Sequence, residues 1–347
     1  MAYAIKKGSD YFKAVTYTGT GASQDVDVGF SPDFTWIKNR SHDGSDPYYG
    51  VHLLYDTIRG VGNRIMSSST AIEAYSGGAL TSFNSDGFSV GTDNSVSYSG
   101  DSFISWNWKA GESTVENTDG SITSQVSANP TSKFSVVTYT GNGSGSATIG
   151  HGLGTTPAMI IARSRSSTQN WRVYHSSFGT TTSNTLYLDL NNATSTTDSE
   201  RISAVASDTF TVTQTSGGAL NASGQNYVAY CFAEVAGYSK FGTYTGNSNA
   251  DGPFVYTGFR PQFFMMKPTN TANSWIFLDT ARDGEFNTID LRLLANTNDL
   301  ENSSPTGYVD FYSNGFKLRY NGAYNNSSYS YIYMAFGSTP FKYANAL

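Results

Sequence analysis

The sequence repeats one plan three times. Each copy opens on the same tripeptide and carries a turn followed by phenylalanine near its end; the openings are Tyr17-Thr18-Gly19, Tyr139-Thr140-Gly141 and Tyr244-Thr245-Gly246, and the later landmarks are Asp86-Gly87-Phe88, Asp208-Thr209-Phe210 and Asn314-Gly315-Phe316. Positions 17 and 139 are 122 residues apart, as are 86 and 208, and the corresponding separations to the third copy are 105 and 106 residues. A fixed period outranks local pattern as a guide to architecture. The chain is therefore predicted to fold as three copies of one unit.

Three strands recur in every copy. A proline-led apolar run that ends in a cation is found at 32–38, 157–163 and 261–267, a second strand at 52–56, 171–175 and 275–279, and a closing strand at 103–108, 227–232 and 331–336. These runs alternate with a period near two, are rich in Tyr, Phe, Val and Ile, and are bounded by Gly, Asn, Ser and Pro, which is typical of half-buried β-strands. The first, fourth and sixth positions of the closing strand are aromatic in the first two copies, while Met334 takes the fourth position in the third.

These patterns predict an all-β protein made of three tandem antiparallel β-sandwich domains of the jelly-roll or lectin-like kind. The best helical candidates, near 59–74 and 200–206, are short and allow at most a turn or two. The predicted domains are 1–111, 112–236 and 237–347, with 112–132 as either a linker or an added edge strand. Because this first junction is the longer one, the first domain is expected to be less fixed than the other two.

Composition narrows the class of protein. Charged residues make up 14% of the chain, against roughly 25% in an average soluble domain. The net charge of −6 and the absence of a basic cluster argue against a nucleic-acid partner, because phosphate binding requires clustered Lys and Arg. The chain has no apolar signal-peptide core and no run of eighteen apolar residues. We therefore expect a protein made in a cytoplasm, without membrane insertion.

The sequence offers little support for catalysis. It lacks the HExxH, Gly-x-Ser-x-Gly and phosphate-loop motifs and any Cys/His cluster. Its single cysteine, Cys231, lies in a closing strand and is expected to be a small buried hydrophobe. The prediction is a protein that is not an enzyme and binds no cofactor.

Paired carboxylates are the remaining catalytic candidates, because a glycosidase requires two of them about 5 to 10 Å apart. The candidates are Asp25 with Asp27, Asp43 with Asp46, Asp56, and the group Asp279, Asp283 and Glu285. Asp56 and Asp279 occupy matching positions, but the second copy has His175 there, so no pair recurs in all three copies. A pair confined to one copy stays open beside the interpretation of these residues as turn acids. The acids are of the kind that binds Ca²⁺ weakly, but the spacing of an EF-hand loop is missing, so no metal is expected.

Tyrosines in loops are the candidate binding residues. Tyr48, Tyr49, Tyr320, Tyr324 and Tyr329 stand among Pro, Gly, Asn and Ser, where a core is not expected. Tyrosine in such surroundings is typical of adaptable recognition surfaces, since its ring gives a large contact area at small rotamer cost. The alternative, that these rings only pack within the fold, stays open for each of them. Trp36, Trp171 and Trp275 are expected to lie in the core or along strand edges.

Several stretches carry a resemblance to a known group of proteins. Residues 105–111, 117–124, 134–141, 149–154 and 230–240 resemble the repeats of virion proteins of marine tailed bacteriophages, which are labelled tail, fibre or lectin-like structural proteins. The resemblance implies a non-enzymatic structural component of the virion, above all a tail fibre or tail-associated protein that contacts the host surface through β-sandwich loops. It also implies other virion proteins as partners, a glycan or protein of the host cell surface, and a homo-oligomer in the particle. The alternatives are a capsid decoration or tail-assembly subunit without receptor binding and, more distantly, a glycan-degrading tail protein.

Overall fold

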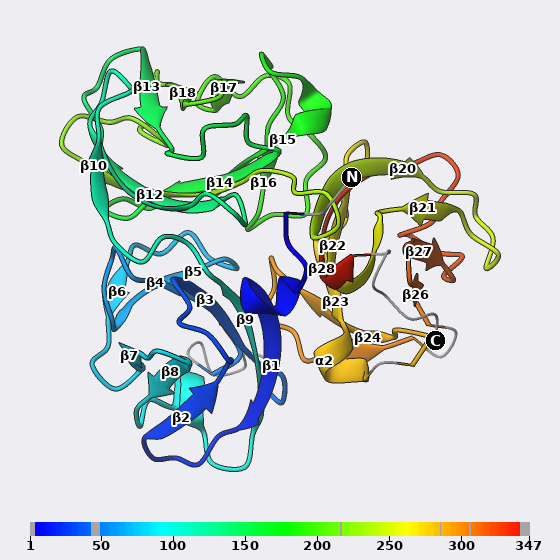
Figure 1. Cartoon of the computed structure of the whole chain (residues 1–347). Coiled ribbons are helices and arrows are strands. Elements are labelled where there is room, and N and C mark those ends of the chain that lie inside the picture. The colour runs from blue at the N-terminus through cyan, green and yellow to red at the C-terminus, as the bar shows by residue number, and fades with distance from the viewer. Residues whose placement is uncertain (1–3, 43–48, 216, 285, 305–306, 341–347) are drawn as a thin grey trace.

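The computed structural model describes residues 4–42, 49–215, 217–284, 286–304 and 307–340 (Figure 1). The protein is all-β, with 45% strand and 4% helix, and its sheets are antiparallel, which confirms the predicted class. Helix in this part of the chain is limited to α1 (Asn94–Ser97), α2 (Thr280–Asp283) and the 3₁₀ turns η1 (Gly8–Asp10) and η2 (Ser176–Phe178). The segments near 59–74 and 200–206, the best helical candidates of the sequence, contain no helix but strands that complete the edges of sheets, within the predicted limit of a turn or two.

The first repeat forms one large and one small sheet. The large sheet has the order β1 (Phe12–Thr18), β9 (Ser102–Trp108), β3 (Phe34–Asn39), β4 (His52–Asp56), β5 (Asn63–Met66) and β6 (Ala74–Tyr75). The small sheet has the order β2 (Gln24–Asp27), β8 (Gly87–Val90) and β7 (Leu80–Phe83).

The second repeat has the same two sheets with an extension. Its large sheet has the order β10 (Val115–Asn117), β11 (Ser124–Asn129), β12 (Phe134–Thr140), β19 (Asn226–Phe232), β14 (Met159–Ser164), β15 (Arg172–His175) and β16 (Leu186–Tyr187). The small sheet has the order β13 (Ser146–Gly150), β18 (Thr209–Thr213) and β17 (Ile202–Val205). The stretch 112–132 thus contains two strands, β10 and β11, and β11 pairs with β12.

The third repeat returns to the plan of the first. Its large sheet has the order β20 (Ser239–Thr245), β28 (Ser330–Pro340), β22 (Phe259–Pro268), β23 (Ile276–Asp279), β24 (Leu291–Leu294) and β25 (Asn302–Ser303), and its small sheet the order β21 (Phe254–Tyr256), β27 (Gly315–Leu318) and β26 (Val309–Tyr312). In every repeat the closing strand lies between the entry strand and the proline-led strand. The predicted strands are thereby confirmed.

The tyrosine of the repeated Tyr-Thr-Gly makes the same contacts in all three repeats. The hydroxyls of Tyr17, Tyr139 and Tyr244 each donate to a carbonyl oxygen in the segment before the closing strand, at 2.8, 2.8 and 2.9 Å. Their rings stack on the first aromatic residue of that strand, with centroids 5.0, 5.0 and 4.5 Å apart. The glycine that follows has no room for a side chain, since a Cβ at Gly19 would lie 2.2 Å from the Tyr98 carbonyl oxygen. The motif therefore anchors the entry strand of each copy.

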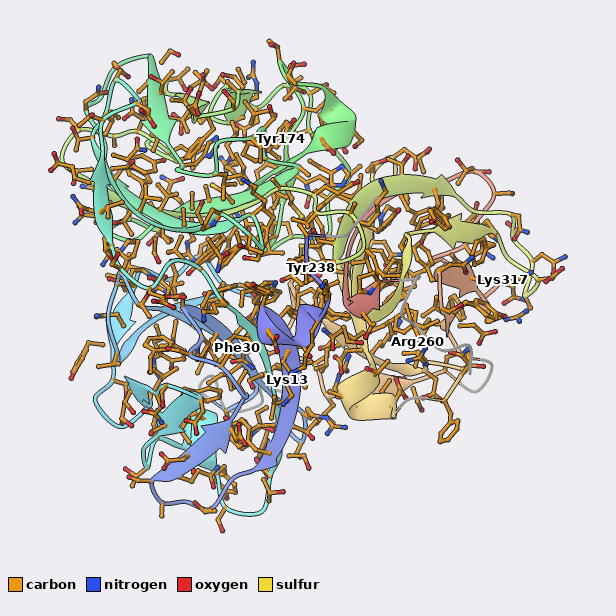
Figure 2. The ribbon with its side chains drawn as sticks, in the orientation of Figure 1. Lys13, Phe30, Tyr174, Tyr238, Arg260 and Lys317 are labelled. Atoms are coloured by element: carbon orange, nitrogen blue, oxygen red, sulfur yellow. The ribbon has the colours of Figure 1, made fainter. Side chains whose placement is uncertain are left out.

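The three large sheets are buried on both faces. One face of each covers the core of its own repeat, and the other meets the remaining two repeats in a common cluster (Figures 1 and 2). Residues of this common cluster include Phe12, Trp36, Trp106, Phe134, Trp171, Tyr230, Phe263, Trp275 and Phe336. The closing strands are accordingly buried at nearly every position, so the prediction of half-buried strands was wrong for them. The first repeat contributes as fully to this cluster as the others, and its longer junction does not set it apart.

Candidate functional site

Three aromatic side chains meet at the centre of the molecule. They occupy the sixth position of the three closing strands, and their ring centroids lie 6.0 Å apart for Trp108 and Phe232, 5.9 Å for Trp108 and Phe336, and 6.1 Å for Phe232 and Phe336. Tyr238 packs beside them, its ring 5.5 Å from that of Phe336, where the three lobes of the ribbon converge (Figure 2). A buried aromatic ring removes about 150–250 Å² from water, which is worth roughly 4–6 kcal/mol. This centre is thus a main source of cohesion between repeats.

The fourth position of the closing strand faces the acid of a neighbouring repeat. The Tyr230 hydroxyl donates to Oδ2 of Asp56 at 2.9 Å, and Nε1 of Trp106 donates to Oδ2 of Asp279 at 3.0 Å. At the third boundary Met334 has no donor to offer, and the matching residue is His175, whose Nε2 lies 3.3 Å from the carbonyl oxygen of Tyr333. The two departures seen in the sequence, a histidine and a methionine, therefore face the same boundary.

Asp56 and Asp279 each form a buried ion pair with an arginine. Nε of Arg59 lies 2.5 Å from Asp56 Oδ2, Nε of Arg282 lies 2.7 Å from Asp279 Oδ2, and all four side chains are fully buried. Burial opposes the charge of Arg59, but the neighbouring Asp56 carboxylate raises the pKa of the guanidinium above its ordinary value. Such fixed and shielded carboxylates hold the fold.

A second acid links each pair to the next repeat. Glu73 binds Arg59 at 3.0 Å and Arg165 of the second repeat at 2.7 Å. Burial opposes the charge of Glu73, but its hydrogen bond from Arg165 and the charge of Arg59 lower the pKa of the carboxyl below its ordinary value. The matching bridge at the other charged boundary joins Glu301 to Arg282 and to Arg40 of the first repeat, at 2.9 and 2.5 Å.

The cations that end the proline-led runs also reach across boundaries. Lys38, Arg163 and Lys267 are buried and donate to backbone carbonyl oxygens, and burial lowers the pKa of Lys267 to about 7. Their acceptors in the adjoining repeat are Asn298 for Lys38, Met66, Ser69 and Ala71 for Arg163, and Asn191 for Lys267. Sequence reasoning noted the repeated cation without assigning it a role; its regular place at the end of an apolar run was the available signal.

The tryptophans predicted to pack in the core do so. Trp36, Trp171 and Trp275 are at most 1% exposed. Nε1 of Trp171 donates to the Met66 carbonyl and that of Trp275 to the Tyr187 carbonyl, both at 2.8 Å, each across a boundary. His52 takes the matching place in the first repeat. Its Nδ1 accepts from Trp36 at 2.9 Å, while burial lowers its pKa. Cys231 is buried as predicted.

The predicted tyrosine site divides between two places. Tyr48 lies outside the described residues. Tyr49 is half-buried in a small aromatic group, with its ring centroid 5.8 Å from His42 and 5.5 Å from Tyr98, and its hydroxyl accepts from Asn94 at 3.1 Å.

The other three tyrosines lie in the third repeat. Tyr324 is only 3% exposed and belongs to that repeat's core, so the expectation of a loop ring outside the core was wrong for it. Tyr320 and Tyr329 are half-buried against the same core. The ring of Tyr320 lies 5.0 Å from Tyr308 and 6.4 Å from Tyr324. Tyr320 and Tyr324 are therefore brought together, whereas Tyr49 belongs to another repeat.

The remaining carboxylates are dispersed. Asp25 and Asp27 are exposed on β2, and Asp43, Asp46 and Glu285 lie outside the described residues. Asp283 accepts from the backbone N–H groups of Asp290 and Leu291, at 3.2 and 2.9 Å, and burial raises its pKa to about 7. These contacts fix the loop between α2 and β24.

A surface depression of about 770 Å³ contains a carboxylate that sequence reasoning missed. Burial raises the pKa of Asp33 to about 6, in spite of hydrogen bonds from the Ala110 N–H at 2.8 Å and the Thr57 hydroxyl at 3.1 Å. Asp10 and Glu112 line the same depression. Since both oxygens of Asp33 accept hydrogen bonds from the protein, its evident role is to tie the end of the first repeat to its own sheet.

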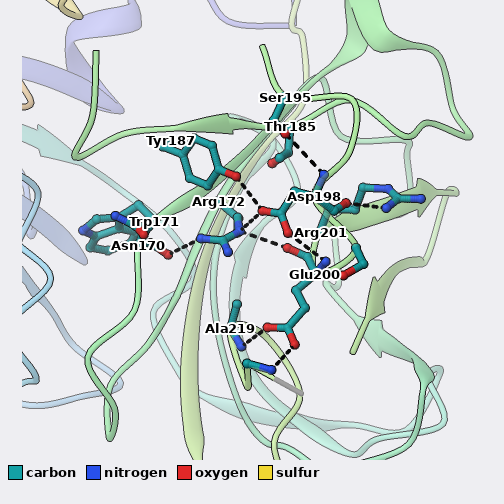
Figure 3. A network of polar contacts seen from close by, with 12 residues as sticks. Asn170, Trp171, Arg172, Thr185, Tyr187, Ser195, Asp198, Glu200, Arg201 and Ala219 are labelled. Atoms are coloured by element: carbon teal, nitrogen blue, oxygen red, sulfur yellow. Dashed lines mark hydrogen bonds and ion pairs between the residues drawn. The ribbon is translucent and has the colours of Figure 1, made fainter. Parts of the chain in front are cut away.

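A polar network stiffens the β15–β16 edge of the second repeat's large sheet (Figure 3). Asp198 accepts from Arg172 at 2.8 Å and from the Tyr187 hydroxyl at 2.8 Å. Glu200 accepts from the backbone N–H groups of Gly217 and Ala219, at 2.5 and 2.7 Å. The loops that carry these residues are thereby held in fixed positions.

Neither a metal centre nor a membrane helix is found in the part of the chain that the structure describes. No three His, Cys, Asp or Glu side chains there are grouped to hold a metal ion, and none of its helices has the length and apolar character to cross a membrane. Residues 7–340 match the model of a protein family described as a domain of unknown function, DUF7483. No curated protein matches the chain.

Proposed function

The chain belongs to the DUF7483 family, and we propose that it is a non-enzymatic structural component of a tailed bacteriophage virion, a tail fibre or tail-associated protein that contacts the host surface. Each repeat would be one β-sandwich domain of the jelly-roll or lectin-like kind, within 1–111, 112–236 and 237–347. The proposal rests on the resemblance of the repeats to virion proteins. It places the protein in the virion.

The observation that best supports a structural role is the use made of the charged side chains. Charged side chains pair across the boundaries between repeats, where Glu73 binds Arg165 and Glu301 binds Arg40. Ion pairs that cross a boundary favour one arrangement of the repeats, because a displaced repeat leaves a partly buried charge without its partner. A body held in one arrangement suits a protein that transmits or resists force in a particle.

The outer faces of the small sheets suit a contact role, since they share a framework and differ in chemistry. At matching positions the edge strands present Asp25 and Asp27 in the first repeat, Thr148 in the second, and Phe254 and Tyr256 in the third. Phe254 and Tyr256 are 46% and 58% exposed. Exposed aromatic rings of this kind are frequent in binding surfaces, and repeated weak contacts in a multivalent particle gain affinity by avidity.

Immunogold electron microscopy of purified virions tests the proposal. Label on the distal tail is expected, together with binding of the isolated protein to host cells. Label on the head, or on the tail without cell binding, would favour the decoration or assembly alternative, and absence from purified virions would contradict both.

Glycan degradation is the more distant alternative, and the observation that favours it is the buried Asp33, which shares a surface depression with Asp10 and Glu112. If that alternative holds, purified protein shortens host polysaccharide and Asp33→Asn abolishes the activity. We expect no change in polysaccharide length with either protein.

A further inference from the structure

Two of the three boundaries between repeats are closed by a charged bridge at the same place. The Glu73 N–H donates to the Arg165 carbonyl oxygen at 2.9 Å, and the Glu301 N–H donates to the Arg40 carbonyl oxygen at 3.3 Å. In both cases the glutamate side chain also binds the guanidinium of that arginine. The backbone contact and the ion pair therefore occur together.

The third boundary keeps the backbone contact but lacks the ion pair between glutamate and arginine. The Thr194 N–H donates to the Thr269 carbonyl oxygen at 2.8 Å. Threonines thus stand where the other boundaries have glutamate and arginine, and Phe178 stands three residues after His175, where Arg59 and Arg282 follow their aspartates.

An open cavity lies at this third boundary. It measures about 570 Å³ and is lined by the second and third repeats. A volume of several hundred cubic ångströms is typical of a site for a small ligand.

The lining is polar and uncharged. Hydroxyl groups come from Ser177, Thr194, Thr196, Thr243, Thr269 and Ser330. Asn184 and Asn270 add amides, Phe178 adds a ring, and none of the described lining residues carries a charge. The Thr194 Oγ1 is buried and has no hydrogen-bond partner among the described residues. Hydroxyls and amides both donate and accept hydrogen bonds, so they match a ligand that bears several hydroxyl groups, whereas an ion would lack a counter-charge.

One wall of the cavity is preorganised by the network of Figure 3. Thr185 and Ser195 exchange backbone hydrogen bonds, both at 2.9 Å, and the Ser195 hydroxyl accepts from the Asp198 N–H at 3.2 Å (Figure 3). Asp198 is itself fixed by Arg172. The segment that presents Thr194 and Thr196 therefore does not need to be ordered when a ligand arrives, which lowers the cost of binding.

We propose that this cavity binds a neutral pyranose sugar, with the hydroxyl and amide groups bonding the sugar hydroxyls and the Phe178 ring packing against its C–H face. The inference rests on the proposed function, since the sugar would be part of a glycan on the host surface. It places the recognition at the boundary of the second and third repeats.

Nuclear magnetic resonance of the full chain, labelled at threonine methyl groups, tests the site. The probes are methyl glycosides of glucose, galactose, mannose and N-acetylglucosamine at millimolar concentration. We expect at least one to shift the methyl signals of Thr194, Thr196, Thr243 and Thr269. The double variant Thr194→Glu/Thr269→Arg, which copies the bridge of the other boundaries, should weaken that binding at least tenfold. A matched control, Thr20→Glu/Thr118→Arg, makes the same side-chain changes at exposed positions and should bind like the unchanged protein.

The assignment is overturned if none of these sugars shifts the cavity signals, if only a charged sugar such as sialic acid does so, or if the bridge variant binds as well as the control. Ala193→Phe, which fills the same cavity without adding charge, replaces the bridge variant if the latter does not fold. Binding of the protein to host cells that persists in a cavity-filled variant would overturn this site while leaving the proposed function intact. Absence of the protein from virions would remove the proposed function without bearing on the sugar titration.

Discussion

The Tyr230 hydroxyl donates a hydrogen bond to Oδ2 of Asp56 across the boundary between the first two repeats, over 2.9 Å. Arg59 binds the same oxygen and also donates to the Tyr230 hydroxyl, at 3.1 Å. One buried carboxylate thus joins a cation of its own repeat to an aromatic residue of the next. Trp106 and Asp279 form the corresponding contact between the first and third repeats.

Removal of the Asp56 charge should destabilise the protein strongly. Asp56→Asn leaves the buried Arg59 without its nearest counter-charge, and breaking a buried pair in this way costs about 3–5 kcal/mol. The double variant Asp56→Leu/Arg59→Met removes both charges and should cost less, because no buried charge is left unpaired. Urea unfolding at neutral pH measures both. A double variant as unstable as Asp56→Asn would show that the pair contributes through packing and not through charge.

Truncation at the aromatic centre should loosen all three repeats together. Trp108→Ala removes a ring that touches Phe232 and Phe336, and such a change typically costs about 3–5 kcal/mol. Hydrogen exchange followed by mass spectrometry should show reduced protection in every repeat. Phe316→Ala, a similar truncation within the core of the third repeat, is the control and should reduce protection there first. Loss of protection confined to the first repeat in Trp108→Ala would mean that the repeats unfold independently.

The strands of each repeat could be predicted because their signals are local. Alternation, β-branched and aromatic residues and flanking turns marked β3, β4 and β9 and their counterparts almost to the residue. The buried second face could not be predicted in this way. Ser105 and Asn107 alternate with Trp106 and Trp108 and read as a solvent face, but both are fully buried, and the amide of Asn107 donates to the Ser105 hydroxyl at 3.0 Å. Buried polar residues whose hydrogen bonds are satisfied in this way make a buried strand face look solvent-exposed in the hydropathy pattern.

The candidate site was harder to predict, since it depends on contacts between distant repeats. Asp56 and Tyr230 are 174 positions apart, and nothing in either neighbourhood indicates the other. The copies nevertheless carried a signal in their differences. His175 and Met334 depart from the shared pattern in different repeats. The structure shows that both departures belong to the same boundary, that of the second and third repeats.

The free energy of unfolding should decrease as the pH is lowered through the range in which a free histidine gains a proton and the buried His175 does not. Burial lowers the pKa of His175 to about 4, against about 6.5 in the unfolded chain. Between these two pKa values the unfolded chain binds a proton that the folded chain does not. The free energy of unfolding therefore decreases as the pH falls from about 6.5 to about 4. Below about pH 4 both states bind the proton, so the contribution of His175 no longer changes. The full effect is roughly 3 kcal/mol. Urea unfolding at several pH values should show a smaller decrease for His175→Gln. His42→Gln, at a partly exposed position, is the control, and equal pH dependence in both variants would contradict the assignment.

The boundary between the second and third repeats should tolerate a buried aspartate–arginine pair like those of the other two boundaries, provided that the aspartate, the arginine and the aromatic donor are introduced together. His175→Asp alone buries a carboxylate that lacks a cation, because Phe178 stands where Arg59 and Arg282 follow their aspartates, and should cost about 3–5 kcal/mol. Adding Phe178→Arg and Met334→Tyr supplies the counterparts of Arg59 and Tyr230, and the triple variant should regain more than half of that loss, as measured by urea unfolding. Phe178→Arg alone serves as the control, because it adds the cation without its acid. A triple variant no more stable than His175→Asp would show that the backbone at this boundary differs too much to hold the pair, and that the three boundaries are alike only in their strands.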